Sequence, residues 1–503
     1  MKKITVSKLF LYRHRFVIGY IVLMAAFVSL LFTLPLLAQD GLSDAEMDSA
    51  ASSYHLSITE AFDGDLVDLP YRVLQKVSIR MFGLTAYSIK LPSIVLGLIL
   101  GVLLILLLNR WFKNNVSLLA SCLVTLSTPF LFLAGSGTPL IMLVFWPTLL
   151  LWLGSKIQGE KKPKPLYSFL FAFALAMAVF TPYMIYFAIF CVIFVALQPH
   201  LRWVVKSLPR VPLIITGLII AAGFAAIIIN IINQPSVLME LVASKDFEFG
   251  NFFPNVLAGF TPAFQWFGES STIFLAPLIS MPILALALTG LFSTTKGFFA
   301  SRNSIATVLI VFGVIITGLN PNSVIFIILP LSILVAHGLK YLLRKWYGLF
   351  PENPYARIAA LLPLTILFGG IIMPGLSQYI NGYHYNSAVA SKFDYSLEII
   401  HRNLSEETLV VTDNYEFYKI LEDSTKLKVV NNIDMAFTDD IAILKGHSDD
   451  KRHQLSRIIT SPMKENSAII YLYTVKGEGK DGTNVRSNEN DQSTQESSKR
   501  AQE

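Results

Sequence analysis

The sequence predicts a polytopic α-helical membrane protein, with about eleven transmembrane helices and a small extracytoplasmic α/β module on the C-terminal side. Two properties of the composition predict this class. Hydrophobic residues make up 53% of the 503 residues, and charged residues only 15%, whereas soluble domains contain about 25% charged residues. A third observation is that uncharged apolar runs recur along the chain, many of them long enough to cross the ~30 Å hydrocarbon core of a membrane as a helix.

The first expected span covers residues 16–38 and follows the basic segment MKKITVSKLFLYRHR. Its apolar run is longer than the core of a usual signal peptide, which favours an uncleaved span over a cleaved leader. The ten further spans are expected at 91–109, 116–134, 138–155, 166–180, 183–198, 211–233, 273–293, 304–319, 323–339 and 358–375.

The connections between the spans predict the orientation, because Lys and Arg accumulate in cytoplasmic loops. Five alternate connections are basic: NRWFKNN, SKIQGEKKPKP, PHLRWVVKSLPR, STTKGFFASRN and KYLLRKWYGLFPENPYAR. The short links GSG and NPN on the other side carry no charge. We therefore expect a multi-pass plasma-membrane protein with a cytoplasmic N-terminus, an extracytoplasmic C-terminus, and two long outer loops at 39–90 and 234–271.

The C-terminal part changes character. Residues 1–375 form the expected transmembrane domain. Residues 376–476 alternate helical stretches (YSLEIIHRNL, YEFYKILED) with strand-like stretches (TLVVTD, LKVV, AIIYLYTV). This alternation predicts a small α/β domain outside the membrane. Residues 477–503 lack the apolar side chains needed for a core and are expected to be a disordered polar tail.

Ionisable residues are missing where a transporter would need them. No Asp, Glu, Lys or Arg falls inside any expected span, and such residues usually mark proton relays and ion-coupled transport. The two cysteines, Cys122 and Cys191, both lie in apolar runs. That position disfavours a disulfide framework or a zinc site. The ionisable chemistry is concentrated instead in the first outer loop, which favours an enzyme working at the outer face.

The first outer loop opens with acids, in the stretch SDAEMDSAASSY. Asp44 and Glu46 are the candidate catalytic residues. They also have a structural explanation, because Ser43 and Glu46 have the spacing of a helix capping box. Asp44 would then lie in the first helical turn, where the helix dipole favours a negative charge. The residues alone leave both interpretations open.

The second half of the same loop, DLVDLPYRVLQKVSIRMFG, predicts an amphipathic helix that starts near Pro70. Arg72, Lys76 and Arg80 recur every four residues and so share one side of that helix. Such a helix lies along a membrane surface. Its cations can either contact anionic lipid nonspecifically or bind the phosphate of a lipid-linked substrate, since Arg matches phosphate geometry well.

The order of these features resembles the GT-C-type membrane glycosyltransferases, closest to the protein mannosyltransferases and the lipid A aminoarabinose transferases. The matching motifs are a Pro-containing helix, then Phe82-Gly83, then Lys90-Leu91-Pro92-Ser93 at the start of the second span, with Lys in place of the family's Arg. The later stretch NSVIFIILPLSILVAHGLKYL is also similar to a late family span. The likeness covers residues 10–155 in sequence and the remainder in layout, and it implies a GT-C-like bundle.

The resemblance implies an inverting transfer of a sugar from a polyprenyl-phosphate donor to a glycan, lipid or protein acceptor at the outer face. An acid near the start of the first outer loop, Asp44 or Glu46, would be the general base. Cations beside the leaving phosphate would stabilise its charge; the candidates are Arg72, Lys76, Arg80 and Lys90. The sequence contains no convincing metal-ligand cluster and no nucleic-acid motif, and it leaves the need for a divalent cation open.

Two departures from the family favour a second function. The family carries charged residues in the regions that here read LAGSGTPLIMLVFW and NPN, and neither stretch has any. A relative that lost catalysis could still bind a lipid-linked glycan or assist membrane assembly. The alternative prediction is therefore a non-catalytic binding or assembly protein with the same fold.

Overall fold

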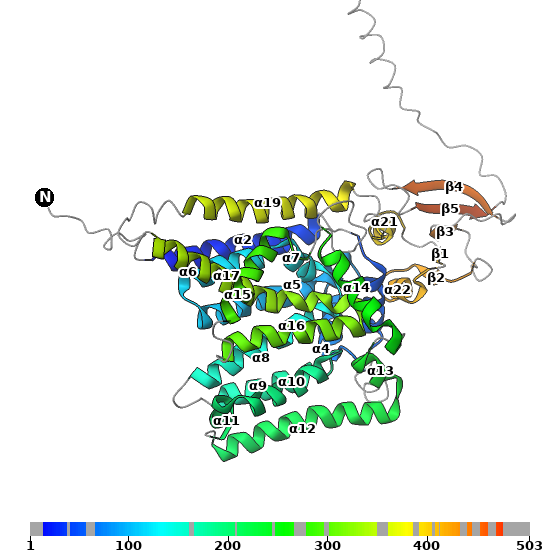
Figure 1. The fold of residues 1–503 in the computed structure, drawn as a ribbon. Coiled ribbons are helices and arrows are strands. Elements are labelled where there is room, and N and C mark those ends of the chain that lie inside the picture. The colour runs from blue at the N-terminus through cyan, green and yellow to red at the C-terminus, as the bar shows by residue number, and fades with distance from the viewer. Residues whose placement is uncertain are drawn as a thin grey trace, which may run out of the picture.

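Helices with roughly aligned axes form one elongated bundle, and a small sheet lies at one end of it (Figure 1). The computed structural model describes residues 14–37, 41–56, 66–159, 165–206, 209–243, 247–265, 278–295, 301–349, 361–385, 392–404, 408–411, 413–432, 440–444, 453–460 and 469–475. The expected disordered tail, 477–503, lies outside these residues.

The elements of the N-terminal half are α2 (Arg15–Leu37), α3 (Asp44–Tyr54), α4 (Leu69–Phe82), α5 (Ala86–Trp111), α6 (Asn114–Thr125), α7 (Thr128–Gly135), η2 (Pro139–Ile141), α8 (Met142–Gly159), α9 (Pro165–Ala178), α10 (Met184–Leu197), α11 (Pro199–Lys206) and α12 (Arg210–Asn233). The rest of the bundle contains α13 (Ser236–Val242), η3 (Phe249–Asn251), α14 (Phe252–Ala263), α15 (Met281–Thr295), α16 (Ser301–Leu319), η4 (Pro321–Ile327), α17 (Ile328–Leu349) and α19 (Leu361–Tyr385).

Each expected span overlaps at least one helix of the described residues, but the number of spans is not settled by helix length. Among the described residues, five helices are long and apolar enough to cross a membrane, or seven if each of two bent helix pairs is one span. Helices α6 and α7 bend by 58° at Leu126–Ser127, and three further apolar helices are shorter than a full span. The chain is a helical membrane protein, and the count of eleven spans stays a prediction.

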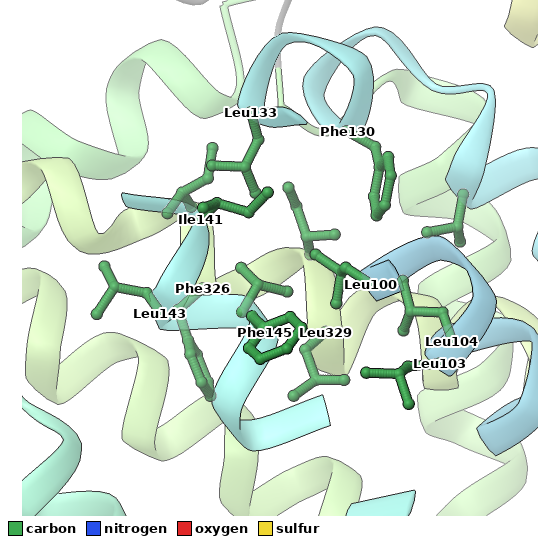
Figure 2. Close-up of a cluster of buried hydrophobic side chains, with 14 of the residues drawn as sticks. Leu100, Leu103, Leu104, Phe130, Leu133, Ile141, Leu143, Phe145, Phe326 and Leu329 are labelled. Atoms are coloured by element: carbon green, nitrogen blue, oxygen red, sulfur yellow. The ribbon is translucent and has the colours of Figure 1, made fainter. Parts of the chain in front are cut away.

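The centre of the bundle is a continuous apolar core. Figure 2 shows leucines of α5 facing aromatic and aliphatic side chains of α7, α8 and the η4–α17 segment. Phe130, Ile141 and Phe326 are completely buried there. Close van der Waals packing of these apolar side chains holds the bundle together.

The C-terminal module is built on a five-stranded mixed sheet with strand order β2-β1-β3-β5-β4. Its elements are α21 (Ser396–Asn403), β1 (Thr408–Val410), α22 (Tyr415–Lys419), α23 (Leu421–Ser424), β2 (Lys428–Val430), β3 (Asp440–Leu444), β4 (His453–Thr460) and β5 (Ile469–Val475). Strand β1 pairs in parallel with β2 and β3, and β5 pairs antiparallel with β3 and β4. The small α/β domain expected outside the bundle therefore exists, with β3 and β4 as additional strands that the sequence did not predict.

Close helix packing at two glycines is a further feature of the bundle. Gly290 of α15 and Gly338 of α17 let these helices approach each other backbone to backbone. A Cβ added at Gly290 would collide with the carbonyl oxygen of Leu334. The helix backbone cannot yield as a side-chain end can, so a methyl group there has to push the two helices apart.

We predict that Gly290→Ala lowers the stability of the bundle by about 1–3 kcal/mol, the usual cost of overpacking. The control is Gly217→Ala in α12, where an added Cβ meets nothing within 4 Å. Thermal unfolding in detergent should show a lower Tm for Gly290→Ala and an unchanged or slightly raised Tm for Gly217→Ala, because Ala is the better helix former. Equal Tm values for the two variants would contradict the packing described.

Candidate functional site

Helix α3 of the first outer loop lies between the bundle and the C-terminal module. Leu42, just before it, forms an isolated antiparallel bridge with Asp394, with backbone N–H···O distances of 2.9 and 2.7 Å. The ring of Tyr395 packs directly over Gly41, where a Cβ would lie 2.6 Å from it. On the bundle side, α3 packs along α4. The loop that carries the predicted acids is thus the junction of the two parts of the chain.

Glu46 is the buried centre of this junction, with 1% of its surface exposed. Its Oε2 accepts a hydrogen bond from the Ser43 amide at 2.8 Å, as the capping-box spacing predicts. Its Oε1 accepts one from the amide of Gly137 at 2.7 Å. The ammonium of Lys90 lies 4.0 Å from the same oxygen and donates to the carbonyl of Gly41 at 2.6 Å. Glu46 and Lys90 therefore form a buried ion pair that joins α3, α5 and the link before η2.

Gln75 of α4 completes the polar interior. Its Oε1 accepts from the hydroxyls of Ser49 and Ser53 at 2.9 and 2.7 Å. Its Nε2 donates to the carbonyls of Ile89 and Gly137 at 3.1 and 2.9 Å. Every hydrogen-bonding atom of this amide is used, which fixes α3 on α4. Gln75 was not predicted from the sequence, because a neutral polar residue inside an amphipathic helix is only a weak sign of a buried contact.

Asp44 has a different environment from Glu46, although it lies only two residues earlier. Its side chain is exposed, and Oδ1 accepts a hydrogen bond from Asn414 of the C-terminal module at 3.2 Å. Asp48, one turn further along α3, is also exposed. Partial burial, and then the charge of Asp44, raise the pKa of Asp48 above its ordinary value. Asp44 is thus the member of the predicted acid pair that solutes can reach.

The three cations of α4 also differ in their contacts and exposure. Arg72 donates to the carbonyl of Ser52 at 2.8 Å, and Lys76 donates to the carbonyl of Leu56. Both therefore hold the C-terminal end of α3, where the helix dipole favours positive charge. Partial burial, and then the charge of Arg80, lower the pKa of Lys76. Arg80 itself is exposed.

The apolar side chains of α4 are exposed, as expected for a helix on a membrane surface. These are Val73, Leu74, Val77, Met81 and Phe82. The opposite face, with Tyr71, Gln75 and Ile79, is buried against α3 and α5. A helix with one apolar face exposed at the outer end of a membrane bundle fits an interfacial position.

A cavity of about 270 Å³ opens at this junction. Its walls come from the end of α2, the start of α5 and helix α21; the lining residues are Pro35, Leu42, Thr85, Ala86, Tyr87, Lys90, Asp394, Tyr395, Leu397, Glu398 and His401. We call it the outer cavity. Glu398 and His401 are exposed at its rim, and Glu398 also pairs with Arg402 at 2.6 Å.

The carboxylate of Asp394 fixes the position of α21 at the cavity. Its Oδ1 accepts from the amide of Ser396 at 2.7 Å, and its Oδ2 accepts from the hydroxyl of Tyr418 at 3.3 Å. Burial, and then the charge of Asp394, raise the pKa of Tyr418 well above its ordinary value. Tyr418 therefore stays protonated and donates to Asp394 at physiological pH.

The contribution of α21 to the site was not predicted from the sequence. A usable signal was present in YSLEIIHRNL, where Glu398 and His401 are spaced i, i+3 and so share one helix face. Nothing local indicated which surface that face would meet. Within the part of the chain that the structure describes, no group of three or more His, Cys, Asp or Glu side chains could hold a metal ion.

We predict that breaking the Glu46–Lys90 pair is costly, because it leaves one buried charge without its partner. Glu46→Gln and Lys90→Met should each lower the stability by about 3–5 kcal/mol, and the double variant should lose less than the sum of the two. Asp48→Asn, an exposed acid on the same helix, should change it by no more than about 0.5 kcal/mol. Thermal unfolding of the four purified variants measures this; additive losses would rule out coupling between the two residues.

Comparison with known proteins agrees with the membrane fold. Residues 71–227 match the model of the family described as dolichyl-phosphate-mannose-protein mannosyltransferase. No curated protein matches the chain.

Two solved structures illustrate the likeness. ArnT from Cupriavidus metallidurans bound to undecaprenyl phosphate has 14% identity and a TM-score of 0.48, over 90% of this chain and 98% of that one. The oligosaccharyltransferase AglB from Archaeoglobus fulgidus, in complex with an inhibitory peptide and a dolichol-phosphate, has 9% identity and a TM-score of 0.49, over 87% of this chain and 70% of that one. Together with the features of the first outer loop, the family match confirms the resemblance of this membrane protein to the GT-C-type glycosyltransferases.

Proposed function

We propose that the protein transfers a sugar, with inversion, from a polyprenyl-phosphate donor to an acceptor at the outer face of the plasma membrane. The observation that carries this proposal is the outer cavity, whose wall includes Leu42, two residues before the exposed Asp44. Residues 71–227 of the same chain match a mannosyltransferase family. The solved structure of ArnT contains bound undecaprenyl phosphate, and that of AglB contains a dolichol-phosphate. A lipid-linked donor is therefore the substrate class to test.

Asp44 is the proposed general base. Its carboxylate would take the proton of the acceptor hydroxyl as that oxygen forms a bond to the anomeric carbon. The bond from this carbon to the phosphate oxygen breaks at the same time, and the lipid phosphate leaves with the electron pair. Asp44 is supported over Glu46 by its exposure, and it lies two residues from Leu42 in the cavity wall.

Glu46 is the proposed positioning residue. Both of its carboxylate oxygens already accept hydrogen bonds from backbone amides, and its charge faces Lys90. A base must be free to approach the acceptor proton, and these bonds hold Glu46 away from it. Its contribution to the reaction would be to fix the first turn of α3, and with it the place of Asp44.

We propose that the four predicted cations contribute unequally to binding of the donor. Arg80 is exposed at the C-terminal end of α4, next to apolar side chains that face the membrane surface. It is placed to meet a phosphate at headgroup height, where an Arg fork suits the phosphate oxygens. Arg72 and Lys76 contribute positive charge nearby, although each also holds a carbonyl at the end of α3. Lys90 lines the outer cavity and is proposed to act through the field of its charge.

We predict that Asp44→Asn abolishes sugar transfer and leaves thermal stability unchanged. Purified protein in nanodiscs would be incubated with a panel of polyprenyl-phosphate sugars, and sugar release or transfer would be followed. Asp48→Asn is the matched control, since it neutralises an exposed acid one turn away on the same helix. Loss of a carboxylate base should lower the rate by 10²-fold or more. Equal activity of the Asp44 and Asp48 variants would exclude Asp44 as the base.

We predict that Arg80→Gln raises KM for the donor about 10-fold, the usual scale of one lost charge-assisted bond, with little change in kcat. Arg72→Gln should differ from it by also lowering Tm, because the Ser52 carbonyl loses its donor. Initial rates against donor concentration, with unfolding curves for both proteins, distinguish the two. A lower Tm for Arg80→Gln without a change in KM would assign Arg80 a structural role only.

A non-catalytic role has one specific observation in its favour. One of the two candidate acids, Glu46, and one of the four candidate cations, Lys90, form an ion pair with each other and bond to the backbone. The same fold would then bind a lipid-linked glycan at the outer cavity without turning it over. If the wild type binds a polyprenyl-phosphate sugar in nanodiscs yet shows no transfer or hydrolysis with any acceptor, this second function replaces the first.

A further inference from the structure

A second and larger cavity lies at the other end of the bundle. Its volume is about 670 Å³. It is lined by Arg110, Trp111, Phe112, Lys113, Asn115, Val116, Lys340, Leu343, Arg344 and Tyr347. Helix α5 begins in the wall of the outer cavity and ends in the wall of this one. Its 26 residues put about 35–40 Å between the two. We call this site the basic cavity.

Four cations converge on the basic cavity from two directions. Arg110 comes from the last turn of α5, and Lys113 immediately precedes α6. Lys340 and Arg344 come from one face of α17, spaced i, i+4. The described lining residues include no Asp or Glu. Four positive charges around a single hollow repel one another, so the arrangement is most stable when an anion lies among them. Arg110, Lys113 and Arg344 are exposed and so accessible to such an anion.

The rest of the lining suits a lipid better than a small solute. Leu343, Phe112 and Val116 are buried and give the cavity an apolar floor. The ring of Phe112 packs edge-on against His337 with centroids 4.8 Å apart, which holds that floor in place. Trp111 and Tyr347 add the amphipathic aromatic side chains that favour the membrane interface. Leu106 and Leu342, on the same two helices, are exposed apolar side chains that an acyl chain could contact.

We infer that the basic cavity is a binding site for the phosphate headgroup of an anionic membrane phospholipid, in the leaflet opposite the C-terminal module. Basic pockets between transmembrane helices are the usual sites of such headgroups. The two Arg side chains supply forked donors for the phosphodiester oxygens, and the two Lys side chains supply charge. The apolar floor accommodates the first part of an acyl chain. This inference is independent of the proposed sugar transfer, because it concerns the opposite end of the bundle.

The test compares lipid binding by the full-length wild-type protein and two double variants. Arg110→Gln/Arg344→Gln removes two charges from the basic cavity. Arg210→Gln/Lys345→Gln removes two exposed charges that do not line the cavity, one at the start of α12 and one in α17, and is the matched control. Each detergent-purified protein is titrated with phosphatidylglycerol, with phosphatidylcholine and with inorganic phosphate. Native mass spectrometry counts bound lipid, and thermal unfolding reports the rise in Tm.

The expected result is that phosphatidylglycerol binds and raises Tm in the wild type and the control, and binds the cavity variant at least fivefold more weakly. Equal weakening in both double variants would overturn the inference, since it would show nonspecific attraction to surface charge. A similar rise in Tm with phosphatidylcholine would also overturn it. A rise with inorganic phosphate equal to that with phosphatidylglycerol would assign the cavity to a soluble anion instead. If the double cavity variant fails to fold, Arg344→Gln alone is compared with Lys345→Gln on the same criteria.

Discussion

The buried ion pair between Glu46 and Lys90 is the interaction on which the outer half of the molecule depends. Two opposite charges removed from water are tolerated only when every remaining hydrogen-bonding position around them is filled. Here the partners are the amides of Ser43 and Gly137 and the carbonyl of Gly41. Satisfying this one pair therefore fixes the first turn of α3, the start of α5 and the link that leads into η2. Gln75 repeats the same principle with a neutral side chain, and it donates to the carbonyl of the same Gly137 whose amide binds Glu46.

This constraint divides the polar residues of the first outer loop into two groups. Residues that satisfy the interior, such as Glu46 and Gln75, are almost fully buried. Asp44 and Arg80, which we propose to meet the substrates, are exposed. A rigid polar interior below an open cavity is what a group-transfer site needs, since misplacing a reacting group by about 1 Å can cost 10²-fold in rate.

Much of this architecture could be predicted from the sequence because its signals are local. Apolar runs located the helices, capping-box spacing located the start of α3, and apolar periodicity located α4 and its exposed apolar face. The contacts that join these elements could not be predicted in this way. Gly137 lies in the uncharged link GSG, which gave no sign of a binding role. Its backbone amide nevertheless donates a hydrogen bond to Glu46. Strand β4 is polar and largely exposed, so its sequence lacks the alternation of apolar and polar residues that predicts a strand.

The two-residue bridge between Leu42 and Asp394 has a consequence for how the protein is made. Leu42 leaves the ribosome some 350 residues before Asp394 does, at about 5–20 residues per second. Throughout that interval α3 lacks the surface that covers Met47 and Ala50 in the finished protein. The segment around α3 is thus synthesised early and completed last. A chain truncated before Asp394 would leave the backbone N–H and C=O groups of Leu42 without the partners that they have in the finished protein.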